Sequence, residues 1–262
     1  MKKGFTLAEV LITLGIIGVV AALVMPSLIA NYKKKVVINQ LKVNYAAIAN
    51  GFKSIIADSE VDNLSDTEFY TLATACGSNY TCKKSAYEKY TQKYFNVVDT
   101  YYYVDQVADG VPTSNSGAIA GAACDKWTGT GVMMYYYLND NTQCYGVRQT
   151  SVKLANGTIM NWEFRENNST YPYAVDVTLD LNGKKGPNAW GRDVFVFIVD
   201  NKGNLIPRSS AKYAEIFVTN NPSLDYNSYY WNGGDYCSKT TTSNGRACSG
   251  RIAEEGWEIN YW

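Results

Sequence analysis

The chain of 262 residues contains no histidine. That absence excludes Ser-His-Asp and Cys-His catalysis, H-E-x-x-H zinc sites and imidazole proton shuttles. G-x-S-x-G, G-x-G-x-x-G and Walker A motifs are absent as well. Charged residues are scarce, at 18%, and 24 basic side chains balance 24 acidic ones. Since a protein that follows nucleic-acid phosphates needs a basic face, this balance argues against nucleic acid as a partner.

Apolar residues make up 46% of the chain, as in ordinary folded proteins, and the length allows one large domain or two small ones. Tyrosine is abundant, with 22 residues against 8 phenylalanines and 6 tryptophans. Many tyrosines predict an amphipathic aromatic surface, which is common where proteins bind partners or sugars.

The cysteines predict disulfide bonds and export from the cytoplasm. Their even number and the lack of C-x-x-C spacing favour disulfides over zinc. Short loops favour the pairs Cys76–Cys82 and Cys237–Cys248, which leaves Cys124–Cys144. The alternative is six free buried thiols in a cytosolic protein, against which the N-terminus argues independently.

An apolar run from Val10 to Met25 is interrupted only by Thr13. As a helix, residues 5–25 would cross a bilayer core of about 30 Å. Three interpretations are open: a cleaved secretory signal, an uncleaved signal anchor, or a span that is trimmed at its cytoplasmic end and retained.

Glu9 lies at the start of this apolar segment. A carboxylate there costs on the order of 3 kcal/mol, so an ionisable group in a membrane span indicates function and requires a partner. The alternative is local, because Thr6 and Glu9 have the spacing of a capping box.

The segment K-K-G-F-T-L-A-E-V-L-I at residues 2–12 resembles the type III signal of type IV pilins and type II secretion pseudopilins. The resemblance extends over residues 2–26. It implies that a prepilin peptidase cuts between Gly4 and Phe5 and then N-methylates Phe5. It also implies that Glu9 pairs with the terminal amine of a neighbouring subunit during filament assembly.

Elementary electrostatics agrees with that implication. Cutting removes Lys2 and Lys3 and leaves one amine on Phe5. At an effective dielectric constant near 20, a pair of charges about 4 Å apart gains about 4 kcal/mol, which is comparable with the cost of burying Glu9. A docked subunit would recover the cost of burying Glu9 and an unpaired one would not, so the charge pair would select one register between neighbouring helices. The amine could also pair within its own helix, because Phe5 and Glu9 are four residues apart.

Small residues and one proline punctuate the span. Gly15, Gly18 and Ala22 form a stripe that either allows close helix approach or is generic for membrane helices. Pro26 cannot donate to the carbonyl of Ala22, so we expect it to kink or interrupt the helix. The resemblance implies that residues 18–26 correspond to a stretch that can unwind in the filament.

Beyond the span, the patterns predict an α+β fold in which the long helix packs against an antiparallel sheet of four to six strands, as in pilins. An apolar stripe from Val37 to Ile56 continues the helix to about Ser59. Residues 60–131 appear as a long connecting region with a polar helix at 85–94. Asn156-Gly157 predicts a hairpin between strands 152–155 and 158–164. Further strands are predicted at 132–138, 145–152, 175–181, 194–199 and 204–207.

These patterns divide the chain into five segments. They are a leader at 1–4, an assembly helix at 5–30, its amphipathic continuation at 31–59, a head at 60–207, and a C-terminal loop region with a disulfide at 208–262. The last segment is rich in Tyr and Trp, so it is either an exposed recognition loop or a loop tied to the head because it has little core of its own.

Asp180, Asn182 and Asp193 could offer oxygen ligands to Ca²⁺. The segment fails the EF-hand pattern, with Thr178 at its first position and Ala189 at its last. The family resemblance favours calcium slightly, because some pseudopilins hold it in a loop near the sheet. The alternative is a glycine-rich connection in which aspartates cap turns. No other cofactor is expected.

The sequence therefore predicts a structural subunit of a type IV pilus or type II secretion pseudopilus, not an enzyme. It would cross the bacterial inner membrane once with an extracytoplasmic head, and its partners would be other subunits, prepilin peptidase, the assembly machinery and lipid. Basic residues lie on both sides of the span, Lys2 and Lys3 before it and Lys33–Lys35 after it, so charge does not determine its orientation in the membrane. The predicted orientation therefore rests on the resemblance and the cysteines. The alternative is a membrane-anchored binding module, adhesin-like or sugar-binding. A third alternative is a membrane-anchored hydrolase that uses the carboxylates of Glu163 and Glu166.

Overall fold

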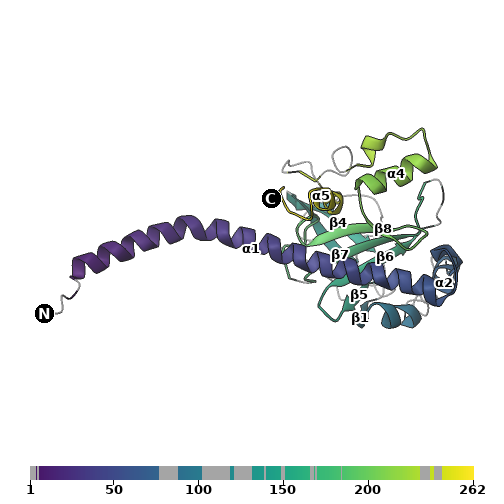
Figure 1. Cartoon of the computed structure of the whole chain (residues 1–262), viewed down its shortest axis with the longest axis horizontal. Helices are drawn as coiled ribbons and strands as arrows, with labels where there is room; N and C mark the ends of the chain where they lie inside the picture. Colours follow the sequence, from purple (N-terminus) through teal and green to yellow (C-terminus); the bar gives the residue numbers. More distant parts are fainter. Residues whose placement is uncertain are drawn as a thin grey trace.

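The protein has two parts, a long N-terminal helix and an α+β head from which it projects (Figure 1). The N-terminus lies at the far end of the helix, and the C-terminus lies on the head near the point where the helix leaves it. The computed structural model describes residues 4, 6–76, 88–101, 119–120, 132–138, 140–148, 151–165, 168, 170–183, 185–230, 237–238 and 244–262.

Helix α1 runs from Leu7 to Asp58, which is 52 residues or about 78 Å. It ends as predicted, with the backbone N–H of Ser59 donating to carbonyls of the last turn. Only its second half packs on the head, and the buried positions there follow the predicted helical stripe. They are Ile38, Leu41, Asn44, Ile48, Gly51, Phe52 and Ile55.

Of the two outcomes predicted at Pro26, a kink or an interruption, the interruption is wrong, because α1 continues through this residue. In Figure 1 the helix is curved but unbroken. Proline removes one backbone hydrogen bond, whereas breaking the helix would expose several further backbone groups. The stretch 18–26 is accordingly helical in this isolated chain.

The main sheet has six antiparallel strands in the order β1-β5-β6-β7-β8-β9. The Asn156-Gly157 hairpin is confirmed, with Gly157 at a φ of 89° between β5 and β6. The strands are β1 (Val97–Tyr101), β5 (Ser151–Leu154), β6 (Ile159–Phe164), β7 (Val175–Asp180), β8 (Val194–Val199) and β9 (Leu205–Pro207).

A second sheet, which the sequence patterns do not predict, contains β2 (Ile119–Ala120), β3 (Val132–Tyr137) and β4 (Asp140–Arg148) in the order β2-β4-β3. The single strand predicted at 145–152 is therefore wrong. Its first part pairs with β3, whereas Ser151 pairs with Tyr101 in the main sheet. Alternation alone does not reveal this division, because the partner of β5 lies some fifty residues earlier in the chain.

Regions predicted as connections contain helices. Between 60 and 101 lie η1 (Leu64–Asp66), α2 (Glu68–Ala75) and a helical stretch at 88–94, which partly overlaps the predicted polar helix. The C-terminal region, predicted as a loop, contains α4 (Ala211–Asn220), η3 (Tyr226–Ser228) and α5 (Cys248–Glu254). Side-chain caps explain two of these helices, because Thr67 and Ser210 accept from backbone amides at the starts of α2 and α4.

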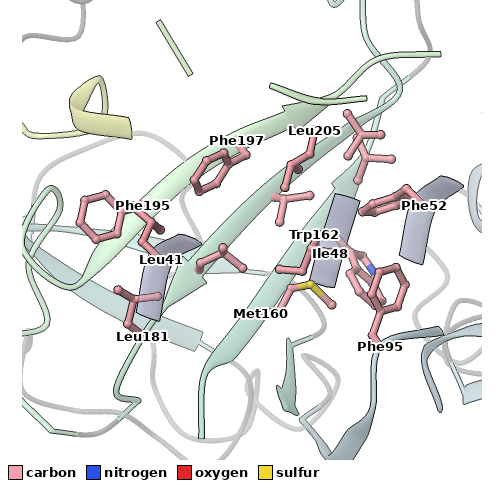
Figure 2. Close-up of a cluster of buried hydrophobic side chains, with 14 of the residues drawn as sticks. Leu41, Ile48, Phe52, Phe95, Met160, Trp162, Leu181, Phe195, Phe197 and Leu205 are labelled. Carbon is pink, nitrogen blue, oxygen red and sulfur yellow. The ribbon is translucent and has the colours of Figure 1, made fainter. Parts of the chain in front are cut away.

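The core lies between α1 and the main sheet. Leu41, Ile48 and Phe52 of α1 face Trp162 and Phe197 of the sheet (Figure 2). Because every residue of β8 is buried, its other face is covered too. There Ile198 packs with Tyr213 and Phe217 of α4. α4 and α1 thus cover opposite faces of the sheet, and α1 is fixed to the head along its whole second half.

Gly250 on α5 gives a stability prediction. A Cβ at this position would lie 2.4 Å from the carbonyl oxygen of Arg208 and 2.5 Å from backbone atoms of Ser209 and Ser210. We expect Gly250→Ala to destabilise the full chain by about 2 kcal/mol in chemical denaturation, because backbone cannot move aside. Ala253→Ser, at a half-buried position of the same helix, is the control and should shift unfolding by less than about 0.5 kcal/mol. Equal effects of the two changes would contradict the packing of α5.

Candidate functional site

The exposed first half of α1, residues 7–33, is the candidate functional site. None of its residues is buried, and Leu7 and Leu23 are 78% and 75% exposed. Its most apolar window has a mean hydropathy of 2.5. These 27 residues extend about 40 Å, which exceeds the bilayer core of about 30 Å. By length and composition the segment can therefore cross a membrane.

Two hydroxyl groups of this segment are satisfied within the helix. The Thr13 hydroxyl donates to the carbonyl of Val10 at 2.9 Å, and that of Ser27 donates to Val24 at 2.9 Å. Glu9 is the only charged residue from Thr6 to Tyr32. The surface is thus apolar apart from one carboxylate near its end.

Glu9 and Thr6 form the predicted capping box. The Glu9 Oε2 atom accepts from the backbone N–H and the hydroxyl of Thr6, both at 2.8 Å, and the Thr6 hydroxyl oxygen accepts from the backbone N–H of Glu9 at 3.3 Å. Among the described residues, no donor contacts Oε1. The local interpretation of Glu9 is therefore realised, and it leaves one carboxylate oxygen for a second donor. Gly4 is exposed, while Phe5 lies outside the described residues.

The small residues give the helix a thin strip. At Gly15 and Gly18 no atom lies within 4 Å of the place that a Cβ would occupy, and Ala22 is exposed. The chain's own head does not cover this strip, so another helix could approach it closely.

Residues 1–25 match the family described as "Prokaryotic N-terminal methylation motif". The segment is a prepilin signal. The resemblance is thereby confirmed for residues 2–25, and the motif supports a precursor of the type IV pilin or pseudopilin kind. No curated protein and no solved structure matches the chain.

Helix α1 is held at the neck, where it enters the head, by C-terminal residues that the sequence patterns did not indicate. Trp262 Nε1 and the Tyr261 hydroxyl donate to the carbonyl of Gly191 at 3.0 and 2.7 Å. Lys34 Nζ donates to the carbonyl of Trp262 at 3.3 Å. Burial raises the pKa of Tyr261, which keeps the phenol a neutral donor. The aromatic ending of the chain was the available signal for these contacts.

The 182–193 loop of the head brings two of the three predicted calcium ligands together. Asn182 Nδ2 lies 3.2 Å from Asp193 Oδ2. Both oxygens of Asp193 also accept backbone amides, from Asn188 and Ala189, at 2.8 Å each. Burial raises the pKa of Asp193, while these amide hydrogen bonds lower it.

Asp180 also caps a turn, since its Oδ1 accepts a hydrogen bond from the backbone N–H of Gly183 at 2.8 Å. The described parts of the chain contain no group of three or more Asp, Glu, Cys or His residues that could hold a metal. These hydrogen bonds support the turn-capping alternative, and calcium binding stays a prediction.

One of the predicted disulfides is confirmed. Cys237 and Cys248 are bonded, with Cα atoms 4.8 Å apart, and both are buried. Cys76 is disulfide-bonded as well, but its predicted partner Cys82 lies outside the described residues. Cys124 does too, so the pair with Cys144 on β4 stays a prediction.

The carboxylates of the hydrolase interpretation do not form a described pair. Glu163 Oε2 accepts from Arg165 at 2.5 Å, and Arg165 Nε donates to Asp176 at 2.6 Å. Glu166 lies outside the described residues. Glu163 therefore takes part in an ion-pair network, an arrangement that supports structure.

Removing the Asp193 carboxylate tests its turn-capping role. We expect Asp193→Ala to lower the free energy of unfolding by about 2 kcal/mol, because two amides near buried surface lose their acceptor. Asp200 is the matched control, since its Oδ1 also accepts two backbone amides, but at an exposed turn where water can replace it. Asp200→Ala should cost about 1 kcal/mol or less.

The wild-type denaturation midpoint should be the same in Ca²⁺ and in a chelator if these carboxylates only cap turns. A midpoint that rises with Ca²⁺, and that Asp193→Ala makes insensitive to it, would instead establish the calcium site.

Proposed function

We propose that the chain is a structural subunit of a type IV pilus or type II secretion pseudopilus, cut between Gly4 and Phe5 and assembled through the exposed half of α1. The observation that carries this proposal is a prepilin signal continuous with an uncovered apolar helix whose one negative charge is Glu9. An exposed apolar surface of this size is unfavourable in water, so lipid or other helices have to cover it. A bundle of such helices would satisfy that requirement.

Glu9 supplies the specificity that an apolar surface lacks. In the assembled bundle its Oε1 would receive the methylated amine of Phe5 from a neighbouring subunit, while Oε2 keeps the capping bonds to Thr6. Since an unpaired carboxylate in this environment costs on the order of 3 kcal/mol, a subunit docked in the right register recovers energy that a misplaced one does not.

The proposed location is the bacterial inner membrane, crossed once, with the head on the extracytoplasmic side. The Cys237–Cys248 disulfide supports that side, because disulfides persist in oxidising compartments. Prepilin peptidase, the assembly machinery, other subunits and the bilayer would be the partners. The membrane-anchored binding module would share the location but keep residues 1–4.

Processing gives the most direct test. The chain recovered from membranes of its host should lack residues 1–4 and carry one added methyl group on Phe5 by intact mass and N-terminal sequencing. In cells without prepilin peptidase it should keep its leader. A chain that retains Met1 in the presence of the peptidase would overturn the proposal and favour the anchored binding module.

Two substitutions separate the roles of Glu9. Glu9→Gln removes the charge but keeps a side chain that can complete the capping box. Thr6→Val removes the capping hydroxyl and keeps the charge. We expect Glu9→Gln to be processed normally but to reduce filament yield about tenfold or more, since about 1.4 kcal/mol of lost pairing suffices for that change.

Thr6→Val should assemble nearly as well as wild type, because a lost cap weakens the helix start by only about 1 kcal/mol. Filament yield is measured by shearing and immunoblotting, with processing as the internal control. Normal assembly of Glu9→Gln together with poor assembly of Thr6→Val would show that Glu9 acts only within its own helix.

A further inference from the structure

A groove lies at the neck, between α1 and the 182–193 loop of the head. Its volume is about 650 Å³, and its lining comes from both parts of the molecule. Ile29, Lys33 and Val36 contribute from α1, and Pro187, Arg192 and Trp262 contribute from the head. None of the functions discussed so far uses this groove.

Its position along α1 places it at the surface of a membrane. The apolar run ends at about residue 30, and the α1 residues of the groove extend from Pro26 to Gln40. If the exposed half of α1 spans a bilayer, the groove therefore opens at the boundary between hydrocarbon and headgroups. Tyr32 and Trp262, which line it, are of the residue types that collect at this boundary.

The groove also carries two cations, Lys33 and Arg192, against one carboxylate, Asp193. Lys33 is exposed, and among the described residues no carboxylate pairs with Lys33 or with Arg192. The Nε atom of Arg192 is buried without a hydrogen-bond acceptor. Asp193 also lines the groove, but both of its oxygens already accept amide hydrogen bonds.

We propose that this groove binds an anionic phospholipid of the membrane in which α1 lies, with the phosphate between Lys33 and Arg192 and the upper part of an acyl chain along Ile29, Val36 and Pro187. The proposal rests on the membrane anchoring included in the proposed function. The charges favour lipid over a second copy of the chain. The exposed half of α1 offers only Glu9 to neutralise two cations, and Glu9 lies in the first turn of α1, at the other end of that half.

The neighbouring lysines provide a matched control. Lys34 is already occupied, since it donates to the carbonyl of Trp262 and lies 6.0 Å from the centre of its ring. Lys35 lies at the same height but lines a different groove, together with Trp257 and Glu258. Lys35→Gln therefore removes one charge near the membrane without changing the proposed site.

The experiment uses the full chain reconstituted in phosphatidylcholine vesicles. One set of vesicles contains brominated phosphatidylglycerol, and a second set contains brominated phosphatidylcholine at the same mole fraction. In both lipids the bromine atoms are on the acyl carbons nearest the glycerol. Quenching of tryptophan fluorescence is measured in each set. Subtracting the signal of Trp262→Phe isolates the residue that lines the groove. Co-flotation of protein with vesicles is recorded for every sample.

Brominated phosphatidylglycerol should quench Trp262 more strongly than brominated phosphatidylcholine. Each basic side chain should contribute about a fivefold preference, which corresponds to about 1 kcal/mol near an anionic surface. Lys33→Gln combined with Arg192→Gln should abolish the preference, and Lys35→Gln should retain most of it. Near-UV circular dichroism of the head verifies that each variant is folded.

Co-flotation with equal quenching by both lipids would overturn the groove proposal and leave the proposed function standing. So would a preference that the double substitution does not change. If neither lipid quenches Trp262 and its emission instead changes with the protein-to-lipid ratio, a second copy of the chain covers the groove. Failure to co-float would overturn membrane anchoring and the groove proposal together.

Discussion

A carboxylate at the end of an otherwise uncharged apolar helix has to find a positive partner or stay near water. Glu9 imposes this constraint on the whole molecule, because residues 7–32 of α1 contain no other charge. The capping box satisfies Oε2 with donors of Thr6 but does not neutralise the charge. Under the proposed function, the amine of a neighbouring subunit supplies the missing cation, and apolar contacts along the helix supply most of the remaining stability.

One continuous helix serves two environments because its side-chain pattern changes along its length. From Ile38 onward the buried residues form a stripe on the head, and Asn44 is the polar exception. Its amide donates to the Thr158 hydroxyl at 3.0 Å, so this buried group is paired. Between residues 6 and 33 no residue is buried. The head therefore buries none of residues 7–33, as assembly through that half requires.

How far the sequence predicts this structure depends on how local each signal is. Periodicity located α1 and its end near Ser59, and Asn156-Gly157 located the hairpin, because both signals lie within a few residues. The separation of β4 from β5 was missed, since it depends on the pairing of Ser151 with Tyr101. The C-terminal helices were missed because the density of Tyr and Gly there suggested loops, although Ser210 caps α4.

The same distinction holds for the candidate site. The prepilin signal is contiguous, so residues 2–26 were sufficient to identify it. The neck contacts join Lys34 to Trp262, the two being 228 residues apart, and the local aromatic pattern at residues 261–262 does not identify their partners. The calcium hypothesis considered which residues carry oxygen atoms but not their existing partners, and the backbone amides that Asp193 accepts are visible only in three dimensions.

Cleavage of the leader, as proposed, would place the terminal cation on Phe5 without rebuilding the helix start. The bond cut lies between Gly4 and Phe5, whereas the capping box uses the backbone N–H and hydroxyl of Thr6. That N–H belongs to the peptide bond between Phe5 and Thr6 and survives the cut. The carboxylate would therefore keep its orientation while the new amine appears one residue before the cap. Processing would change the charge of the helix terminus and leave its geometry in place, so a subunit becomes competent to dock without refolding.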